Sequence, residues 1–215
     1  MRPAPLAWLA LLALLSPGAA PADAGDASGD DWKAARSGSG EGYAYRIFSN
    51  QTEGGEAVVR YRVRGTVDAE PDALVSAVRA IASDPERAPD RQKRRLLSAN
   101  GNVFITHTVI DMPPMFTDRD IVTRGVSSFD ARSGVHRIEW AAIEHPDAPE
   151  GDGAVRIEEG AGFWSFTPID RNSSRVGYET HIDLGGSLPA WLIQSMIAAM
   201  VGTHFEHVAQ EALSR

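Results

Sequence analysis

Apolar side chains recur at helical spacing near the end of the chain, over residues 187–213. Pro189 stands in the expected first turn, where a missing N–H does no harm, and Ser187 is a candidate N-cap. At 100° per residue the apolar side chains fall on one face of this helix: Ile193, Met196, Ile197, Met200, Val201 and Val208. The pattern predicts an amphipathic helix of ~26 residues and about 39 Å, and its apolar face needs a broad partner.

Polar and apolar positions alternate with a period of two through much of the remaining chain, which predicts strands. Residues 43–49 and 57–67 form the first pair, and the glycines Gly54 and Gly55 predict a hairpin turn over residues 50–56. Helical spacing returns over residues 70–83, with Pro71 in the first turn. Five further strands, separated by turn-rich segments, predict an antiparallel meander: residues 102–111, 120–129, 135–144, 154–167 and 175–184.

Before the first strand, residues 31–35 predict a short helix that carries Trp32, and the small residues 37–40 end it. The order of elements predicts one α+β domain over residues 31–215, in which a curved antiparallel sheet wraps around the long C-terminal helix. A bent sheet around a helix encloses a space that either side chains or a ligand can fill.

The first 24 residues have the pattern of a secretory signal peptide. Arg2 supplies the positive start, residues 6–15 are an apolar run, and Ala22 and Ala24 are the small residues of a cleavage site. Because the apolar run is too short to span a bilayer, an uncleaved anchor is the weaker alternative. We expect a signal peptide over residues 1–24, a flexible leader over residues 25–30, and a soluble mature protein that is periplasmic or secreted.

The composition narrows the classes of function. The 215-residue chain has no cysteine, which excludes a disulfide framework. Its net charge of -8 argues against nucleic acid as a partner. One basic cluster is either a solvated surface or a patch that docks on a membrane, and it consists of Arg91, Lys93, Arg94 and Arg95.

Two motifs resemble those of the START family, the StAR-related lipid-transfer domains. The first is the proline-containing loop MPPMFTD over residues 112–118, followed by Arg119 and Asp120. The second is the glycine pair Gly185 and Gly186, followed by the sequence SLPAWL that opens the last helix. The sequence FITH before the proline loop and the order of elements extend the resemblance over residues 32–213.

This resemblance implies a helix-grip fold with one apolar tunnel, one bound hydrophobic lipid, transient contact with a membrane and no cofactor. We also expect a monomer. The candidate ligand-binding residues are Thr108, Gly125, Trp140, Trp164, Ile193, Met196, Ile197, Met200 and His204. The candidate gate combines the proline loop with the start of the last helix and consists of Met112, Met115, Phe116, Leu188 and Trp191. Alternatively, Met115 and Phe116 are plugs of the core.

Sterol-binding relatives pair a buried acid with an arginine inside the tunnel, and the resemblance places Thr108 and Gly125 at those two positions. Arg124 is one residue early, and one step along a strand turns a side chain to the opposite face. We therefore expect Arg124 on the outer face and no cation inside the tunnel. An uncharged tunnel favours a neutral ligand, such as a sterol or a related polycyclic lipid, over an acidic phospholipid.

A lipid carrier is expected rather than an enzyme, and a lipid sensor would have the same sequence features as a carrier. Arg119 and Asp120 are adjacent on a strand, so they point to opposite faces and cannot form one catalytic pair. The six histidines show no HxH or HxxxH spacing, and the Gly-x-Ser-x-Gly sequence of hydrolases is absent. The alternative is a helix-grip cyclase or hydrolase, with His107 and His204 as candidate acid–base residues.

Overall fold

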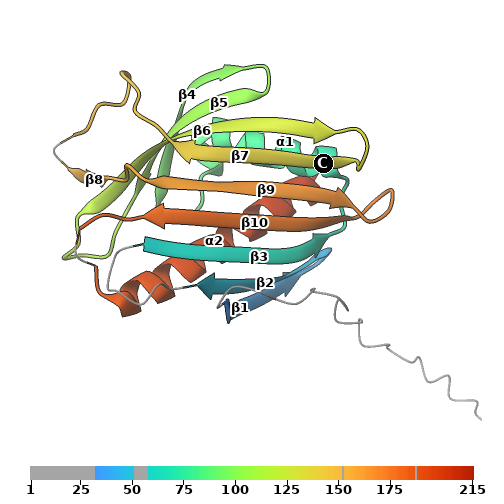
Figure 1. Cartoon of the computed structure of the whole chain (residues 1–215), viewed down its shortest axis with the longest axis horizontal. Helices are drawn as coiled ribbons and strands as arrows, with labels where there is room; N and C mark the ends of the chain where they lie inside the picture. Colours follow the sequence, from blue (N-terminus) through green and yellow to red (C-terminus); the bar gives the residue numbers. More distant parts are fainter. Residues whose placement is uncertain (1–31, 51–57, 152, 187) are drawn as a thin grey trace, which may run out of the picture.

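The computed structural model describes residues 32–50, 58–151, 153–186 and 188–215. Within these residues ten strands form one curved sheet, and two α-helices pack on one of its faces (Figure 1). The strands are β1 (Lys33–Gly40), β2 (Tyr43–Asn50), β3 (Val58–Val67), β4 (Gln92–Asn100), β5 (Val103–Ile110), β6 (Asp118–Asp130), β7 (Val135–Ala142), β8 (Ala154–Arg156), β9 (Gly160–Pro168) and β10 (Ser174–Asp183). The helices are α1 (Pro71–Ser83), the short 3-10 helix η1 (Pro85–Arg87) and α2 (Ala190–Leu213).

The strand order in the sheet is β1-β2-β3-β10-β9-β7-β6-β5-β4, and neighbouring strands in it run antiparallel. β10 lies between β3 and β9, so segments far apart in the sequence meet in the middle of the sheet. The pairing of β2 with β3 confirms the antiparallel pair predicted for residues 43–49 and 57–67. β8 lies off this path and pairs with β6 in parallel.

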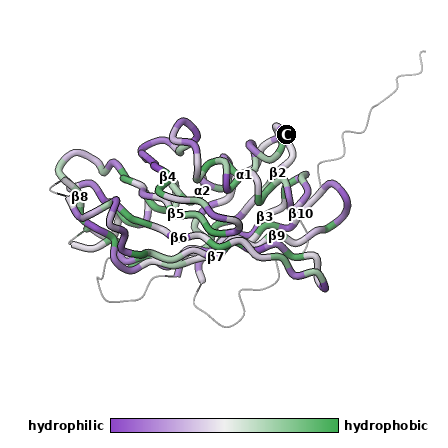
Figure 2. The backbone as a smooth tube through the Cα atoms, turned by 90° about the horizontal axis from the view of Figure 1, so that it is seen from above, coloured by the Kyte–Doolittle hydropathy of each residue, from purple (hydrophilic) through white to green (hydrophobic). Residues whose placement is uncertain are grey.

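Both helices cover the concave face of the sheet. α2 packs against α1 and against β1, β2 and β3, whereas α1 packs against β4, β7 and β9. Figure 1 shows α2 crossing behind β3 and β10, and Figure 2 shows both helices on one side of the sheet. This arrangement is the α+β helix-grip architecture that the sequence predicts.

The core lies between the helices and the sheet, and it follows the predicted apolar face of α2. Four members of that face are buried, namely Ile193, Ile197, Val201 and Val208. Two others, Met196 and Met200, are half-buried against the core. Phe205, which the sequence analysis did not place on this face, is fully buried and its ring lies 4.8 Å from that of Tyr45. The helix is thus held by an aromatic cluster as well as by aliphatic packing.

The predicted helix over residues 31–35 is wrong, because Lys33–Gly40 forms strand β1, paired with β2. The packing around the glycines of β1 explains why a strand forms here. A Cβ on Gly38 would lie 2.5 Å from the ring of Tyr45, and a Cβ on Gly40 would lie 2.5 Å from the ring of Tyr43. The two tyrosine rings therefore cover bare backbone, and this cross-strand packing outweighs the local helix propensity of the alanines.

Two strand predictions also need correction. The sequence analysis placed no strand over residues 92–100, where β4 forms the edge of the sheet beside β5. The strand predicted over residues 154–167 is divided into β8 and β9. Arg156 in β8 makes two hydrogen bonds to Asp120 of β6, at 3.1 and 2.7 Å. These bonds hold β8 beside β6, so the chain must leave the sheet before β9 begins.

α2 begins at Ala190 with Pro189 as its N-cap, three residues after the start predicted at Ser187. Gly185 and Gly186 precede it with φ angles of 63° and 65°, a left-handed conformation that favours glycine. The expected sharp turn from strand to helix is therefore present. Ser187, the proposed signal peptide and leader, and most of the predicted turn over residues 50–56 lie outside the described residues. Within the described residues, no helix is long and apolar enough to cross a bilayer.

Candidate ligand cavity

A cavity of about 170 Å³ lies between α2, α1 and the concave face of the sheet. A single water molecule needs only ~10–15 Å³ of such space, so this volume is large for the interior of a domain. Most of its lining side chains are apolar and come from every layer of the fold: Val59, Val78, Ala82, Phe104, Ile110, Ile121, Ile138, Trp140, Trp164, Ile182, Leu184, Ile197, Met200 and Val201. The polar lining residues are Gln92, Arg94, Thr106, Thr108, Thr123, Tyr178, Thr180 and His204.

Strand periodicity explains how the sheet lines this cavity. β5 alternates half-buried and buried residues, and its buried members Phe104, Thr106, Thr108 and Ile110 all face the cavity. Residues two apart on a strand share a face, so the sequence FITHTVI places two threonines among apolar neighbours. Thr106 satisfies its hydroxyl by a 2.9 Å hydrogen bond to Thr123 of β6. The wall of the cavity is thus apolar with a few paired hydroxyl groups.

Six of the nine candidate ligand-binding residues line the cavity together: Thr108, Trp140, Trp164, Ile197, Met200 and His204. The other three lie elsewhere. Gly125 is buried under Phe104, whose ring would lie 2.3 Å from a Cβ at that position, so the glycine makes room for a lining residue. Ile193 is buried nearer the start of α2, and Met196 borders a neighbouring depression. Contact of these residues with a ligand stays a prediction.

The prediction that no cation lies inside the cavity is wrong, because Arg94 of β4 lines it. Its Nε donates to Thr108 Oγ1 at 3.2 Å, its Nη1 to the Ile81 carbonyl at 3.3 Å, and its Nη2 to Gln92 Oε1 at 2.8 Å. Sequence reasoning read this residue as part of a surface cluster. The other three members of that cluster, Arg91, Lys93 and Arg95, are indeed exposed.

Burial controls the protonation of the polar groups around the cavity. It lowers the pKa of Arg94 to about 10, which leaves the guanidinium protonated at neutral pH. It lowers the pKa of His204 to about 3, with a further contribution from the nearby positive charge of Arg94, so the imidazole is neutral. It also raises the pKa of Tyr178 to about 12. Both His204 and Arg94 keep some accessible surface, as expected for side chains that border a cavity.

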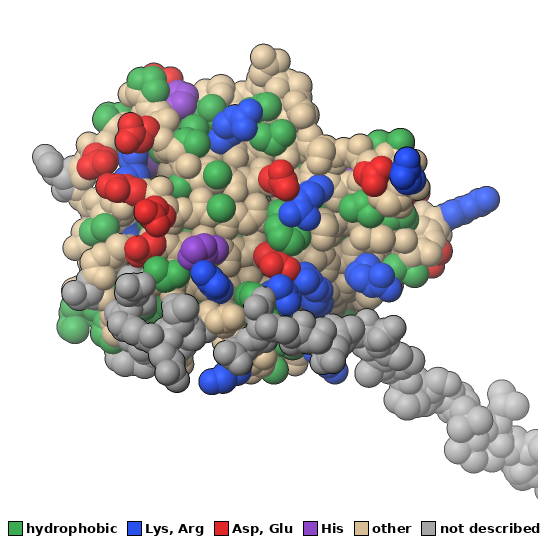
Figure 3. All heavy atoms as spheres, viewed as in Figure 1, with side chains coloured by type: hydrophobic (Ala, Val, Ile, Leu, Met, Phe, Trp, Pro, Cys, Tyr) green, Lys and Arg blue, Asp and Glu red, His purple; other side chains and the backbone are tan. Residues whose placement is uncertain are grey.

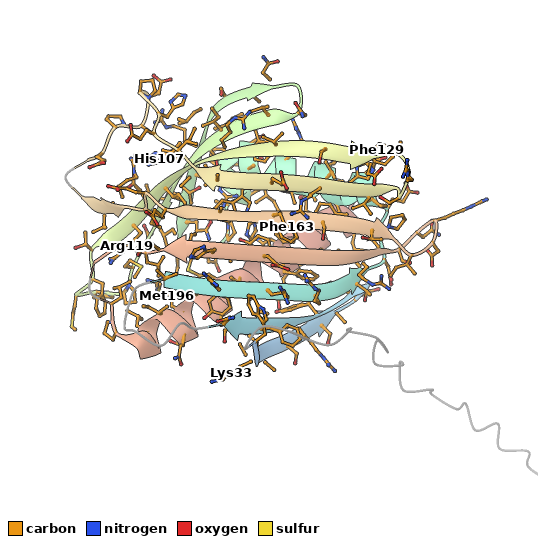
Figure 4. The ribbon with its side chains drawn as sticks, in the orientation of Figure 1. Lys33, His107, Arg119, Phe129, Phe163 and Met196 are labelled. Carbon is orange, nitrogen blue, oxygen red and sulfur yellow. The ribbon has the colours of Figure 1, made fainter. Side chains whose placement is uncertain are left out.

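A second depression, of about 190 Å³, adjoins the cavity at the start of β4. Gln92 and Met200 line both spaces, so these two side chains form the partition between them. The remaining residues of the depression are Pro89, Asp90, Arg91, Pro113, Leu192, Met196, Ala199 and Thr203. Met196 lies on α2 at this end of the molecule (Figure 4). This place is the candidate entrance to the cavity.

The predicted gate lies near this entrance without lining it. Met115 is 93% exposed with a φ of 89°, whereas Met112 is buried, and Phe116 and Leu188 are half-buried against the core. Phe116 therefore has the character of a core plug, and Met115 does not. The side chain of Trp191 lies outside the described residues. Pro113 of the same loop borders the depression, and the gating role of the loop stays a prediction.

Arg119 and Asp120 point to opposite sides of β6, as expected, and they hold different parts of the chain. Arg119 donates to the carbonyls of Leu184 and Gly185, at 3.1 and 2.9 Å, and so holds the turn that precedes α2. Asp120 accepts bonds from Arg156 and lies 2.8 Å from His107 Nε2. Burial alone would raise the pKa of Asp120, but these hydrogen bonds outweigh it and lower the pKa. His107 and Arg119 are labelled in Figure 4.

The outer face of the sheet carries charged side chains (Figure 3). Arg62 and Arg64 both bond Glu179 of β10 at 2.8 Å, and Arg137 stacks over the ring of Phe163 at 3.6 Å. Arg124 is exposed on this face, which confirms the orientation predicted for it. His107 also belongs to this side of the sheet, so His204 is the histidine of the cavity.

Comparisons with known proteins agree with this geometry. No protein-family model matches the chain. The uncharacterized protein PA1579 of Pseudomonas aeruginosa is 27% identical over 179 residues, which cover 81% of this chain and 83% of that protein. The STAR-related lipid transfer protein of Xanthomonas axonopodis has a TM-score of 0.69 at 23% identity, and the match covers 85% of this chain and 99% of that one.

Two further solved structures show the breadth of the fold. Human StAR-related lipid transfer protein 5 matches with a TM-score of 0.63 at 18% identity, over 88% of each chain. The Zhui aromatase/cyclase from Streptomyces sp. R1128 matches with a TM-score of 0.51 at 15% identity, over 74% of this chain and 95% of that one. The resemblance to START domains is thus confirmed at the level of the fold, which cyclases share more distantly.

Proposed function

We propose that this protein binds one hydrophobic lipid in the cavity under α2 and carries it between membranes. The observation that carries the proposal is the apolar cavity of about 170 Å³ between α2 and the sheet. The fold shared with the Xanthomonas STAR-related lipid transfer protein supports a carrier role. The signal-peptide pattern of residues 1–24 supports a periplasmic or secreted location, and a monomer suffices because one chain encloses the cavity.

Binding in this proposal is a partition from water into an apolar space. Each CH₂ group that leaves water contributes about 0.8 kcal/mol, and the aromatic walls supplied by Trp140 and Trp164 add contact area. Gln92 and Met200 line both the cavity and the depression, so a ligand that enters or leaves by this route has to move them aside. Neither group is charged, so moving them aside exposes no buried charge to the ligand's hydrocarbon chain.

The test of this function is transfer of a fluorescent lipid between vesicles. Donor vesicles hold the lipid together with a non-exchangeable quencher, and acceptor vesicles hold neither. Full-length protein is expected to raise the transfer rate in proportion to its concentration, because each molecule carries one lipid per trip. A rate equal to that of spontaneous transfer at all protein concentrations would contradict the proposal.

An enzyme of the cyclase or hydrolase class is the second candidate. Two observations support this candidate. The Streptomyces aromatase/cyclase has a similar fold, and the cavity is lined by Arg94, Tyr178 and His204. However, the pKa values of about 3 for His204 and about 12 for Tyr178 lie far from neutrality. General acid–base groups work best with a pKa near the working pH, so these side chains suit binding better. Recovery of the bound ligand in changed form would favour the enzyme.

The expected preference for a neutral sterol depended on an uncharged cavity. Arg94 removes that premise, because it places a positive charge at the wall. The lipid class therefore has to be argued again from the groups that the cavity presents.

A further inference from the structure

Arg94 brings a positive charge to the cavity without a matching negative charge. The lining residues include no Asp or Glu, and His204 is a neutral imidazole. Within the described residues the Arg94 guanidinium forms no ion pair, whereas Arg62, Arg64, Arg87 and Arg156 each pair with a carboxylate. A largely buried charge without a counter-charge destabilises the protein. An anionic ligand would supply the missing charge.

The hydrogen bonds of Arg94 leave donors for such a ligand. An arginine has five N–H donors, and the described contacts use one each on Nε, Nη1 and Nη2. One N–H on each Nη atom therefore has no partner among the described residues. All three acceptors are neutral oxygens of Thr108, Ile81 and Gln92, so they orient the guanidinium without neutralising it.

A second polar group of the cavity wall is the hydroxyl of Thr180. Thr180 is buried and interacts with the Tyr178 hydroxyl, and within the described part of the chain no other group hydrogen-bonds to its Oγ1. A buried hydroxyl with so few partners gains from a further hydrogen bond. Thr180 and Arg94 both line the cavity, so an acceptor group placed there could serve both needs.

We propose that the cavity takes a single-chain anionic amphiphile, of the fatty-acid class, whose carboxylate binds Arg94 and whose hydrocarbon chain lies against the apolar wall. This inference rests on the proposed lipid-binding function and names the ligand class for that site. The chain would lie along Ile138, Trp164 and Ile197, which belong to the same cavity.

Size favours a single-chain carboxylate over a two-chain phospholipid, and charge favours it over a phosphate monoester. A carboxylate carries one negative charge and matches one guanidinium, whereas a phosphate monoester carries nearly two at neutral pH. The cavity holds one cationic side chain for either group. Its volume of about 170 Å³ is also below the roughly 300–1,000 Å³ of sites that enclose drug-sized ligands. One hydrocarbon chain therefore requires less widening of that space than two.

A purely structural role for Arg94 has to be distinguished from binding of a carboxylate. Its bond to the Ile81 carbonyl lies in the last turn of α1, where a cation stabilises the negative end of the helix. If that were its whole role, replacing Arg94 would lower the melting temperature and leave ligand preference unchanged. The test therefore measures preference and stability on the same variants.

The experiment compares palmitate with hexadecanol and hexadecyl phosphate, which share a chain length and differ in headgroup. Binding to delipidated full-length protein is followed by tryptophan fluorescence, since Trp140 and Trp164 line the cavity. Wild-type protein is expected to bind palmitate at least tenfold more tightly than either other probe. Arg94→Gln should abolish the preference for palmitate over hexadecanol and retain hexadecanol binding. Arg94→Lys, which keeps the charge, should retain part of the preference.

Arg95→Gln is the matched control, because Arg95 is the next residue of β4 and is exposed. It should keep the full preference for palmitate. Equal binding of palmitate and hexadecanol by wild-type protein would overturn the carboxylate assignment and leave the lipid-binding function standing. Tighter binding of hexadecyl phosphate would also overturn it, in favour of a phosphate ligand. Failure to bind any of the three would count against both proposals. If Arg94→Gln does not fold, a retained preference in Arg94→Lys decides the role of the charge.

Discussion

Met200 is the residue at which the cavity, the depression and α2 meet. It lines both spaces and is half-buried against the core. Met200→Glu should abolish lipid binding, because a carboxylate opposes an apolar chain, while the protein stays folded because the new charge can reach water through the depression. The measurement is lipid that co-purifies with the variant, together with its melting curve.

Gln210→Glu is the control for that variant, since it adds the same charge at an exposed position of the same helix. It should retain lipid. Loss of the folded state in Met200→Glu would show that this part of α2 is ordinary core.

His204 makes stability depend on pH in a defined direction. Its pKa is about 3 in the folded chain against an ordinary value of 6.5, so the unfolded chain takes up a proton first as the pH falls. Stability is therefore complete above pH 6.5 and decreases on acidification towards pH 3. Between pH 6.5 and 4.5 the loss from this group should be about 2 kcal/mol.

The measurement is the free energy of unfolding of the wild type and of His204→Gln at both pH values. The groups near His204 are Arg94 of β4, Tyr178 of β10 and His207 of α2, and Arg94 and Tyr178 keep their protonation in this range. The variant should lose less stability than the wild type on acidification. An equal loss in both proteins would show that His204 is not the group responsible.

The role of a residue could be predicted where the residue belongs to an element with clear periodicity. The face of α2 predicted Ile197, Met200 and His204 at the cavity, and the resemblance to START domains predicted Thr108. Arg94 was missed because it sits in a run of basic residues that looks solvated. Its register opposite Thr108 was the decisive information, and register between strands comes from pairing rather than from composition.

At the scale of elements, the start of the chain and the edge of the sheet were the hardest to predict. β1 is rich in Ala, Ser and Gly, and its strand structure depends on the tyrosines of β2 that cover its glycines. β4 carries charges on its outward side at Lys93 and Arg95, and its inward side begins with Gln92, Arg94 and Leu96. The side chains of β4 do alternate between the two faces of the sheet. Because the inward-facing ones are partly polar, the sequence shows no apolar stripe there. The strands other than β1 and β4, and both α-helices, had clear periodicity and were predicted, although β8 and β9 were joined into one strand and α2 begins later than predicted.

The proline loop is the element whose proposed gating role can be tested separately. Met115 is almost fully exposed at its tip, and its left-handed conformation belongs to the turn that the Phe116 N–H closes on the Pro113 carbonyl. We predict that Met115→Ser slows lipid transfer between vesicles several-fold, because the loop loses its apolar contact with the bilayer. The melting temperature should change by no more than a few degrees, since an exposed side chain loses little packing.

Ile169→Ser is the matched control. Ile169 is also exposed, but it follows the C-terminal end of β9 and does not belong to the proline loop. Its transfer rate should equal that of the wild type. Equal slowing in both variants would point to a general effect of surface apolarity, and no slowing in Met115→Ser would remove the loop from the gate.

At the scale of the whole molecule, the curvature of the sheet creates the cavity. The sheet is bent so that β4 and β1 at its two edges approach the same pair of helices. The interior that results is larger than its own side chains fill, and it is closed at one end by two neutral side chains. A domain that keeps such a space gives up packing energy, and the proposed lipid would return it.

Native mass spectrometry of the freshly purified full-length protein tests this account most directly, because it weighs the chain together with whatever the cavity holds. We predict one lipid per chain, released unchanged on denaturation and absent from Met200→Glu. We further predict that the released molecule is a single-chain acid. A ligand-free wild-type chain that also fails to take up lipid from vesicles would contradict the central claim that this cavity is a lipid site.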